Sequence, residues 1–231
     1  MTTHTTVEPA TALIPAGAFV MGDDAGRPDE QPAHRVYVSA FRLALVPVTN
    51  RDYAAFLAST AHEPPRFWRD ARFNAPEQPA VGVSWHDAVA YCEWLSQHTG
   101  RRYRLPSEAE REKAARGGVD GAPYPWGDAP GEAGGRFLQE APWPVGQASP
   151  NGYGLCDMAY NVHEWCSDWY GAEYYAVSPG RDPPGPATGV RRASRGGAWR
   201  HQIKVSRCSA RSSLDPTFRY NDYGFRVALE A

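Results

Sequence analysis

Helix signals appear in three segments of the first half of the chain, and in the first two of them apolar residues recur three and four positions apart. Each segment starts after a Ser or Thr that can cap a helix, at Thr49, Ser84 and Ser107. Glycines follow the last apolar residues of the second and third segments, at Gly100 and at Gly117–Gly118, and a glycine there commonly ends a helix. The pattern predicts three short helices.

Brief apolar and β-branched runs predict strands, while helical spacing does not return after Gly118. Short helices followed by mostly irregular backbone over a small mixed sheet make the fold class α+β. The Pro/Gly-rich stretch 179–189 is interpreted as a surface loop, because the roughly forty residues after it are too few for a second core. We expect one compact domain over 13–231 behind a flexible tail at 1–12. The predicted strands are 19–21, 35–38, 41–46, 191–194 and 225–229.

Composition excludes two classes of partner. A formal net charge of −2 over 231 residues, with no basic run, argues against nucleic acid. No apolar run approaches the roughly 18 residues of a membrane span. Residues 1–13 lack the basic start and apolar stretch of an export signal, so we expect a cytoplasmic protein with reduced cysteines.

Two segments depart from both helical and strand patterns and concentrate the candidate chemistry. They are NGYGLCDMAYNVHEWCSDWY at 151–170 and RGGAWRH at 195–201. Dense Trp, Tyr, Asn and Gly with scattered acids indicate a backbone that specific side-chain or metal contacts hold in place. The two segments therefore predict either a functional site or a structural scaffold.

The order of motifs along the chain resembles the formylglycine-generating enzyme family, also called sulfatase-modifying factors. The resemblance covers roughly residues 13 to 229. It is carried by IPAGAFVMG at 14–22, VTNRDYAAFL at 48–57, VGVSWHDAVAYCEWL at 81–95, RLPSEAEREKAARGG at 104–118, YPWGD at 124–128, the segment 150–170, RGGAW at 195–199 and GFR at 224–226.

The resemblance implies a single compact C-type-lectin-like domain with little regular secondary structure and structural calcium. The best-known members oxidise a cysteine of a sulfatase to formylglycine, using oxygen and copper held by two cysteines. Here His201 takes the place of the first cysteine, Ser206 lies nearest the second, and Ala198 replaces a serine of the site. A two-thiolate copper site needs soft sulfur ligands. We therefore predict that this chain is not a true cysteine-to-formylglycine oxidase.

Two histidines stand where the family has other residues. His163 replaces the first Trp of the family's Asn-x-Trp-Glu-Trp run, and His201 replaces the copper-binding cysteine. The resemblance places both positions in one groove. With a carboxylate such as Asp168 or Asp222, they would form the two-His-one-carboxylate arrangement of non-haem iron, and iron or copper is the expected redox metal. In the alternative interpretation, His163 packs against Trp165 and His201 bonds a loop carbonyl.

Calcium is expected from oxygens clustered within eight residues, on Asp157, Asn161 and Glu164. The alternative is that these acids accept hydrogen bonds from backbone N–H groups of a tight loop. By resemblance, the family's second calcium site uses the side chains of Asp157 and Glu164 and the carbonyls of Tyr160 and Val162. The family's other calcium site has no convincing counterpart at 134–138, where Arg136 replaces an Asn.

Two functions remain open from the sequence. The first is a metal-dependent oxidoreductase acting on a thiol, peptide or amino-acid-derived substrate, with His163 and His201 as catalytic metal ligands. The alternative is a non-catalytic, calcium-stabilised binding or accessory domain.

Arg111 stands where the family has Trp, which predicts that this helix face meets solvent or a partner. The candidate substrate-binding residues are Trp199, Arg200, Arg211 and Tyr223.

Overall fold

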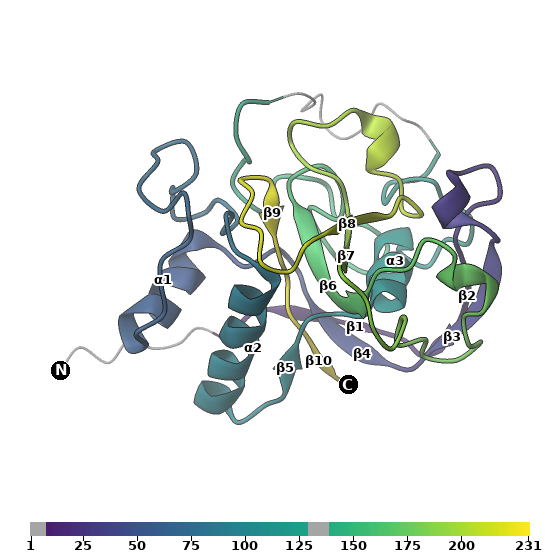
Figure 1. The fold of residues 1–231 in the computed structure, drawn as a ribbon, viewed down its shortest axis with the longest axis horizontal. Coiled ribbons are helices and arrows are strands. Elements are labelled where there is room, and N and C mark those ends of the chain that lie inside the picture. The colour runs from purple at the N-terminus through teal and green to yellow at the C-terminus, as the bar shows by residue number, and fades with distance from the viewer. Residues whose placement is uncertain (1–7, 129–138) are drawn as a thin grey trace.

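The three predicted helices are confirmed in the computed structural model, which describes residues 8–128 and 139–231 (Figure 1). Each begins with a reciprocal capping box, in which a Ser or Thr and an acid three residues later bond each other's backbone N–H. Gly100 and Gly117 end α2 and α3 at φ of 71° and 62°. No helix of the described part is long and apolar enough to cross a bilayer. The helices are α1 (Asn50–Ser59), α2 (Trp85–Thr99) and α3 (Glu108–Arg116).

The strands form three small sheets. The first is antiparallel in the order β1-β4-β10-β5, and the second is the hairpin β2-β3. The third has the order β8-β7-β6-β9, and its β6-β9 pair is parallel. The strands are β1 (Thr11–Ile14), β2 (Gly17–Met21), β3 (His34–Val38), β4 (Phe41–Ala44), β5 (Tyr103–Arg104), β6 (His163–Trp169), β7 (Arg192–Arg195), β8 (Ser212–Leu214), β9 (Tyr223–Gly224) and β10 (Ala228–Glu230).

Each predicted strand overlaps an observed one, and two expectations need correction. The strand β6 lies within a segment that the sequence pattern predicted to be irregular. Its seven residues do not alternate between buried and exposed positions: His163 to Cys166 and Asp168 are buried, and only Ser167 and Trp169 are partly exposed, so the strand has no polar face. The predicted tail also extends too far, since Thr11 and Ala12 pair with Ala44 and Leu43 in β1. Residues 1–7 lie outside the described part.

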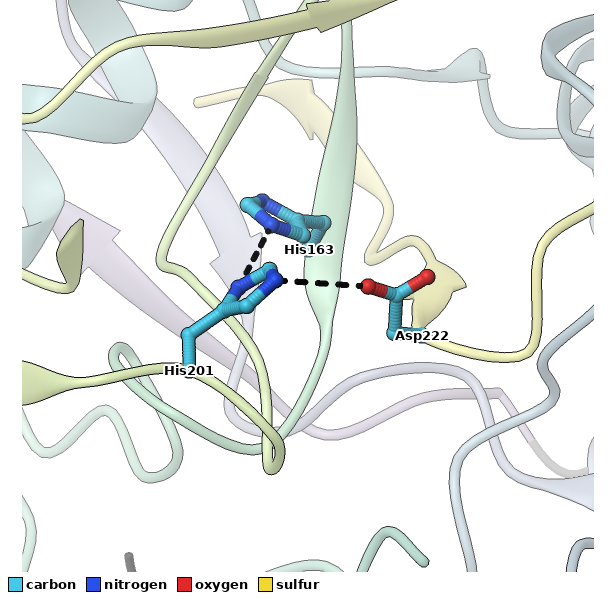
Figure 2. A group of neighbouring side chains, drawn as sticks. All are labelled: His163, His201 and Asp222. Atoms are coloured by element: carbon cyan, nitrogen blue, oxygen red, sulfur yellow. Dashed lines mark hydrogen bonds and ion pairs between the residues drawn. The ribbon is translucent and has the colours of Figure 1, made fainter. Parts of the chain in front are cut away.

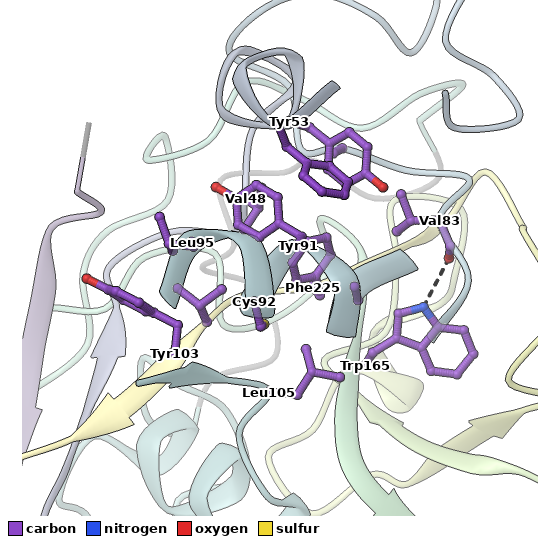
Figure 3. Close-up of a cluster of buried hydrophobic side chains, with 14 of the residues drawn as sticks. Val48, Tyr53, Val83, Tyr91, Cys92, Leu95, Tyr103, Leu105, Trp165 and Phe225 are labelled. Atoms are coloured by element: carbon purple, nitrogen blue, oxygen red, sulfur yellow. Dashed lines mark hydrogen bonds between the residues drawn. The ribbon is translucent and has the colours of Figure 1, made fainter. Parts of the chain in front are cut away.

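An aromatic core joins α1 and α2 to the strands (Figure 3). Tyr53 stacks on Tyr91 at 5.7 Å between ring centroids, and Phe225 meets Tyr91 edge-on at 5.3 Å. Trp165 of β6 is fully buried, and its indole N–H donates to the carbonyl of Val83 at 3.1 Å. This bond fixes β6, which begins at one of the candidate histidines, against the segment that precedes α2.

Helix α3 is highly charged, and yet all nine of its residues are buried. Its charges are satisfied internally: Lys113 donates to the carbonyls of Pro15 and Gly17 at 2.6 and 3.0 Å, and Arg116 pairs with Glu112 at 2.6 Å. The prediction that the helix face carrying Arg111 meets solvent is wrong, because Arg111 is only 1% exposed even in this single chain. Its polar groups bond inside the domain instead.

Replacing Phe225 by Ala should lower the free energy of unfolding by about 3–5 kcal/mol, because it removes a fully buried ring from the aromatic core. Urea unfolding followed by tryptophan fluorescence measures the change. Phe218→Ala is the matched control, because Phe218 is 46% exposed and should lose less than about 1 kcal/mol. Equal losses in the two variants would contradict this account of the core.

Candidate metal centre

The backbone of the third sheet brings His163 beside Asp222. His163 begins β6, pairs in register with Tyr223 of β9, and donates its backbone N–H to the carbonyl of Asp222 at 2.8 Å. His201 comes from the turn that follows β7, where its N–H bonds the carbonyl of Ala198 at 2.9 Å. Because β7 pairs with β6, this turn lies over the start of β6 (Figure 2).

The two imidazoles converge, as the sequence predicted. His163 Nε2 lies 3.2 Å from His201 Nδ1, and His201 Nε2 lies 3.8 Å from Asp222 Oδ2. One ligand atom from each residue lies within 4.8 Å of the other two. The carboxylate of the group is therefore Asp222, and His201 lies between His163 and Asp222, facing each with a different ring nitrogen (Figure 2).

Burial favours the neutral form of both imidazoles at the centre. His163 is 5% exposed and stacks on Tyr223 at 4.7 Å, which differs from the packing against Trp165 considered above. Burial, then the neighbouring His201 and Arg200, lower the pKa of His163 to about 3. Burial also lowers the pKa of His201, whose side chain is 32% exposed. Both rings are therefore neutral at pH 7 and keep a lone pair for a metal.

Two buried polar atoms at the centre lack a hydrogen-bond partner among the described residues. They are His163 Nδ1 and Asp222 Oδ1. The other oxygen of Asp222 accepts from Arg200 Nε at 2.8 Å. Native proteins rarely bury polar atoms without partners, so Asp222 Oδ1 is an oxygen available to an ion, whereas His163 Nδ1 is not the ring nitrogen that faces His201. Imidazole nitrogen and carboxylate oxygen suit iron and copper.

Asp168, the other carboxylate considered for the centre, lies elsewhere. Its Oδ2 accepts from the backbone N–H of Glu108 at 2.9 Å and from the hydroxyl of Ser167 at 3.0 Å. It thus helps to cap α3. Burial, then the nearby Glu108 carboxylate, raise the pKa of Asp168 to about 7.

The candidate substrate residues divide into two groups. Arg200 bonds Asp222, Tyr223 stacks on His163, and the indole N–H of Trp199 donates to the carbonyl of Asn221, the neighbour of Asp222, at 3.4 Å. These three lie at or next to the centre, but only Arg200 has an exposed side chain, at 44%.

The structure does not bring Arg211 to the centre. Its Nε and Nη2 each donate a hydrogen bond of 2.8 Å to the carboxylate of Glu108, and the residue is 2% exposed. Two aromatic rings, of Tyr170 and Tyr175, flank the guanidinium at 4.8 and 4.2 Å. Arg211 is therefore a buried structural ion pair, and the prediction that it binds substrate is wrong.

The predicted calcium residues do not fit a calcium ion in this chain. Glu164 is fully buried, and both of its oxygens accept hydrogen bonds from two arginines. Arg111 donates at 2.8 and 3.0 Å, and Arg226 donates at 2.6 and 2.8 Å. A carboxylate saturated by two guanidinium groups has no free oxygen for a metal.

Asp157 is also engaged. Its oxygens accept from the indole N–H of Trp143 at 3.2 Å and from the backbone N–H of Gly146 at 2.5 Å, and burial raises its pKa. Tyr160, which stands where the family has glycine, adopts a φ of 75° and stacks on Trp126. The other family calcium position, at 134–138, lies outside the described residues.

The four cysteines offer no copper pair. All are free, and Cys92, Cys166 and Cys208 are buried. Burial raises the pKa of each of these three thiols, to about 12 for Cys208. A buried thiol in apolar surroundings is inert, because the thiolate is the metal ligand and the nucleophile.

The family described as "Sulfatase-modifying factor enzyme 1-like domain" matches residues 1–231. The chain belongs to this family. The formylglycine-generating enzyme of Streptomyces coelicolor is 35% identical to it, over 94% of this chain and 88% of that enzyme. The serine/threonine-protein kinase pkn1 of Chlamydia pneumoniae is 37% identical, but the chain spans only 37% of that relative's length. A mouse relative named inactive C-alpha-formylglycine-generating enzyme 2 is 29% identical.

Solved structures confirm the fold of this sulfatase-modifying factor domain. PvdO from Pseudomonas aeruginosa superposes with a TM-score of 0.85 at 32% identity, over 96% of this chain and 95% of that one. Treponema denticola variable protein 1 superposes with a TM-score of 0.84 at 26% identity, over the same shares. The single C-type-lectin-like α+β domain expected from the motifs is therefore correct.

Asp168→Asn should make the stability of the protein less dependent on pH. The folded-state pKa of about 7 lies above the ordinary value of 3.8, so the wild type loses stability as pH rises from about 4 to about 7. A shift of roughly three pKa units corresponds to a loss on the order of 4 kcal/mol at most. The Asn variant stays neutral and should gain relative to wild type over that range.

Urea unfolding of both proteins at pH 4, 5.5, 7 and 8 measures the difference. Asp120→Asn, a change at an exposed aspartate, is the control and should follow the wild type at every pH. A difference between the Asp168 variant and wild type that stays constant from pH 4 to 8 would contradict the raised pKa.

Proposed function

We propose that this protein is a metal-dependent oxidoreductase whose ion is held by His163, His201 and Asp222. The observation that carries the proposal is the 3.2 Å separation of the two imidazoles, with a buried carboxylate beside them. Iron or copper is the ion, oxygen is the oxidant, and the substrate is a thiol, a peptide or an amino-acid derivative.

The spacing of the donor atoms supports a shared ion. With metal–nitrogen bonds of about 2.0–2.2 Å, two ligand atoms of one ion lie at most about 4.4 Å apart. The imidazole pair meets this limit as it stands. The largest separation within the group, up to 4.8 Å, slightly exceeds it. His201 faces His163 with Nδ1 and Asp222 with Nε2, and only one of these nitrogens would bind the shared ion, so the partly exposed His201 ring would turn on binding.

The donor set favours iron. It offers two neutral imidazoles and one carboxylate and contains no thiolate or thioether, which are the ligands that Cu(I) selects. When bound, an Fe(II) ion with these three ligands supplies open positions for oxygen and substrate. Copper(II) is the second choice, since it also accepts imidazole and carboxylate.

The protein's own residues would set the orientation at this ion. Tyr223 stacks on the ring of His163 and holds its plane, while the backbone bond to Asp222 fixes the distance between these two residues. Arg200 anchors one oxygen of Asp222 and places a positive charge at the exposed side of the centre. That charge favours a substrate with a carboxylate next to the reacting group.

A non-catalytic binding or accessory domain is the second candidate. The observation that favours it is the Arg200–Asp222 ion pair at 2.8 Å, which already satisfies one oxygen of the proposed ligand. The same family includes a mouse relative that is named inactive. Metal content separates the candidates, because a binding domain of this kind needs no redox ion.

The wild-type protein should bind about one equivalent of Fe(II) under anaerobic conditions, and His201→Ala should bind it at least about 100-fold more weakly, because one of three ligands is lost. Isothermal titration and elemental analysis measure binding. His86→Ala is the control, because His86 is exposed on α2 and lies outside the group. Failure of the wild type to bind iron or copper would contradict the oxidoreductase proposal.

Incubation of the copper-loaded protein with a sulfatase-motif peptide should yield no formylglycine. The three buried cysteines present no thiolate, and none of the four cysteines belongs to the centre. Mass spectrometry of the peptide tests this, with the Streptomyces coelicolor enzyme as positive control. Aldehyde product above the no-protein background would overturn it.

A further inference from the structure

We infer that the guanidinium of Arg111 replaces the structural cation that the family resemblance implies for the loop before β6, so that this loop needs no calcium. The inference does not rest on a redox ion at the histidines. It starts from the geometry around Glu164, where a side chain of α3 reaches the loop 157–162.

The end of Arg111 lies in a nest of oxygens. Its Nη2 donates to the carbonyl of Met158 at 2.8 Å and to Glu164 Oε1 at 3.0 Å. Gly196 covers the same point: a Cβ there would lie 3.1 Å from Arg111 Nη2, 3.3 Å from the carbonyl of Met158 and 3.5 Å from that of Val162. A carboxylate with backbone carbonyls is the donor type that a hard cation takes, and here a guanidinium uses it.

Charge excludes a second cation at this point. Arg111 is 1% exposed, and Glu164 and Arg226 are 0% exposed, so water does not screen them. Two guanidinium groups already face one carboxylate. A divalent ion would meet two positive charges at hydrogen-bond distance in a dry interior, where like charges repel strongly.

The tie also stabilises an unfavourable turn that leads to the centre. Tyr160 holds a φ of 75°, a conformation that side chains other than glycine rarely adopt, and its N–H donates to the carbonyl of Gly196 at 2.8 Å. Arg111 fixes the carbonyl of Met158 on one side of this turn and Glu164 on the other. Because the guanidinium is covalently attached, the turn cannot lose its cation to dilution or to a chelator.

Thermal melting with and without calcium tests the inference. All proteins carry His201→Ala, so that removal of a metal from the histidines does not contribute. The melting temperature of the Arg111-containing protein should change by less than about 1 °C between excess EGTA and 5 mM calcium chloride, and desalted protein should hold no calcium. A stabilisation by calcium of about 3 °C or more, or one equivalent of bound calcium, would overturn the inference.

Variants of Arg111 make the test site-specific. Arg111→Ala should melt lower in EGTA and regain about 3 °C or more with calcium or with methylguanidinium, because either cation can enter the vacated oxygen nest. Arg111→Lys keeps a cation and should not respond to calcium. Arg116→Ala is the matched control, since it removes another buried arginine of α3 from its partner Glu112.

Equal gains in the Arg111→Ala and Arg116→Ala variants, or no gain in a folded Arg111→Ala protein, would sink the inference. If Arg111→Ala does not fold under any condition, the Arg111→Lys variant decides. A folded Lys variant that ignores EGTA and calcium supports the replacement of a cation, and stabilisation of that variant by calcium contradicts it.

Discussion

The structure depends on one carboxylate, Glu164, held in a dry interior by two arginines. An isolated buried carboxylate is prohibitively costly, and removal of one partner from such a group is strongly destabilising. Four charge-assisted hydrogen bonds satisfy both oxygens here. Arg226 also donates to the carbonyls of Ala44 and Asp157, so a single cluster joins β4, α3, β6 and the loop before β6. Regular secondary structure is sparse, and these side-chain hydrogen bonds hold segments together that longer strands would join by backbone hydrogen bonds in other folds.

The candidate centre lies next to this cluster on the same strand. His163 directly precedes Glu164, and both residues pair with the short parallel strand β9. Fixing Glu164 therefore fixes the backbone of His163. The His163 N–H donates to the carbonyl of Asp222 at 2.8 Å, so the backbone of Asp222 is fixed as well. The third side chain, of His201, stands on a turn at the surface. The centre thus combines two rigid buried groups with one adaptable group.

Local chemistry made part of this structure predictable. The helices follow from caps and spacing within about ten residues, and the histidine pair followed from motif positions in the family. The choice between Asp168 and Asp222 could not be made, because only the β6-β9 pairing decides which carboxylate reaches the histidines. The burial of Arg111 is not predictable for a related reason: its partner Glu164 lies 53 positions away, and a charged residue on a polar helix resembles a surface residue. The departure from Trp in EAEREK was the available signal.

The parallel pairing of β6 with β9 has a consequence for the order of folding. His163 and Asp222 are separated by about sixty residues, and the entropy of closing such a loop must be overcome before their contacts contribute. The helices α1 and α2, by contrast, can form from local contacts. The contacts of the candidate centre therefore contribute to stability only once this long loop has closed. A substitution that weakens β9 would therefore disturb the approach of Asp222 to His163 more than it disturbs α1 and α2, whose backbone hydrogen bonds are local.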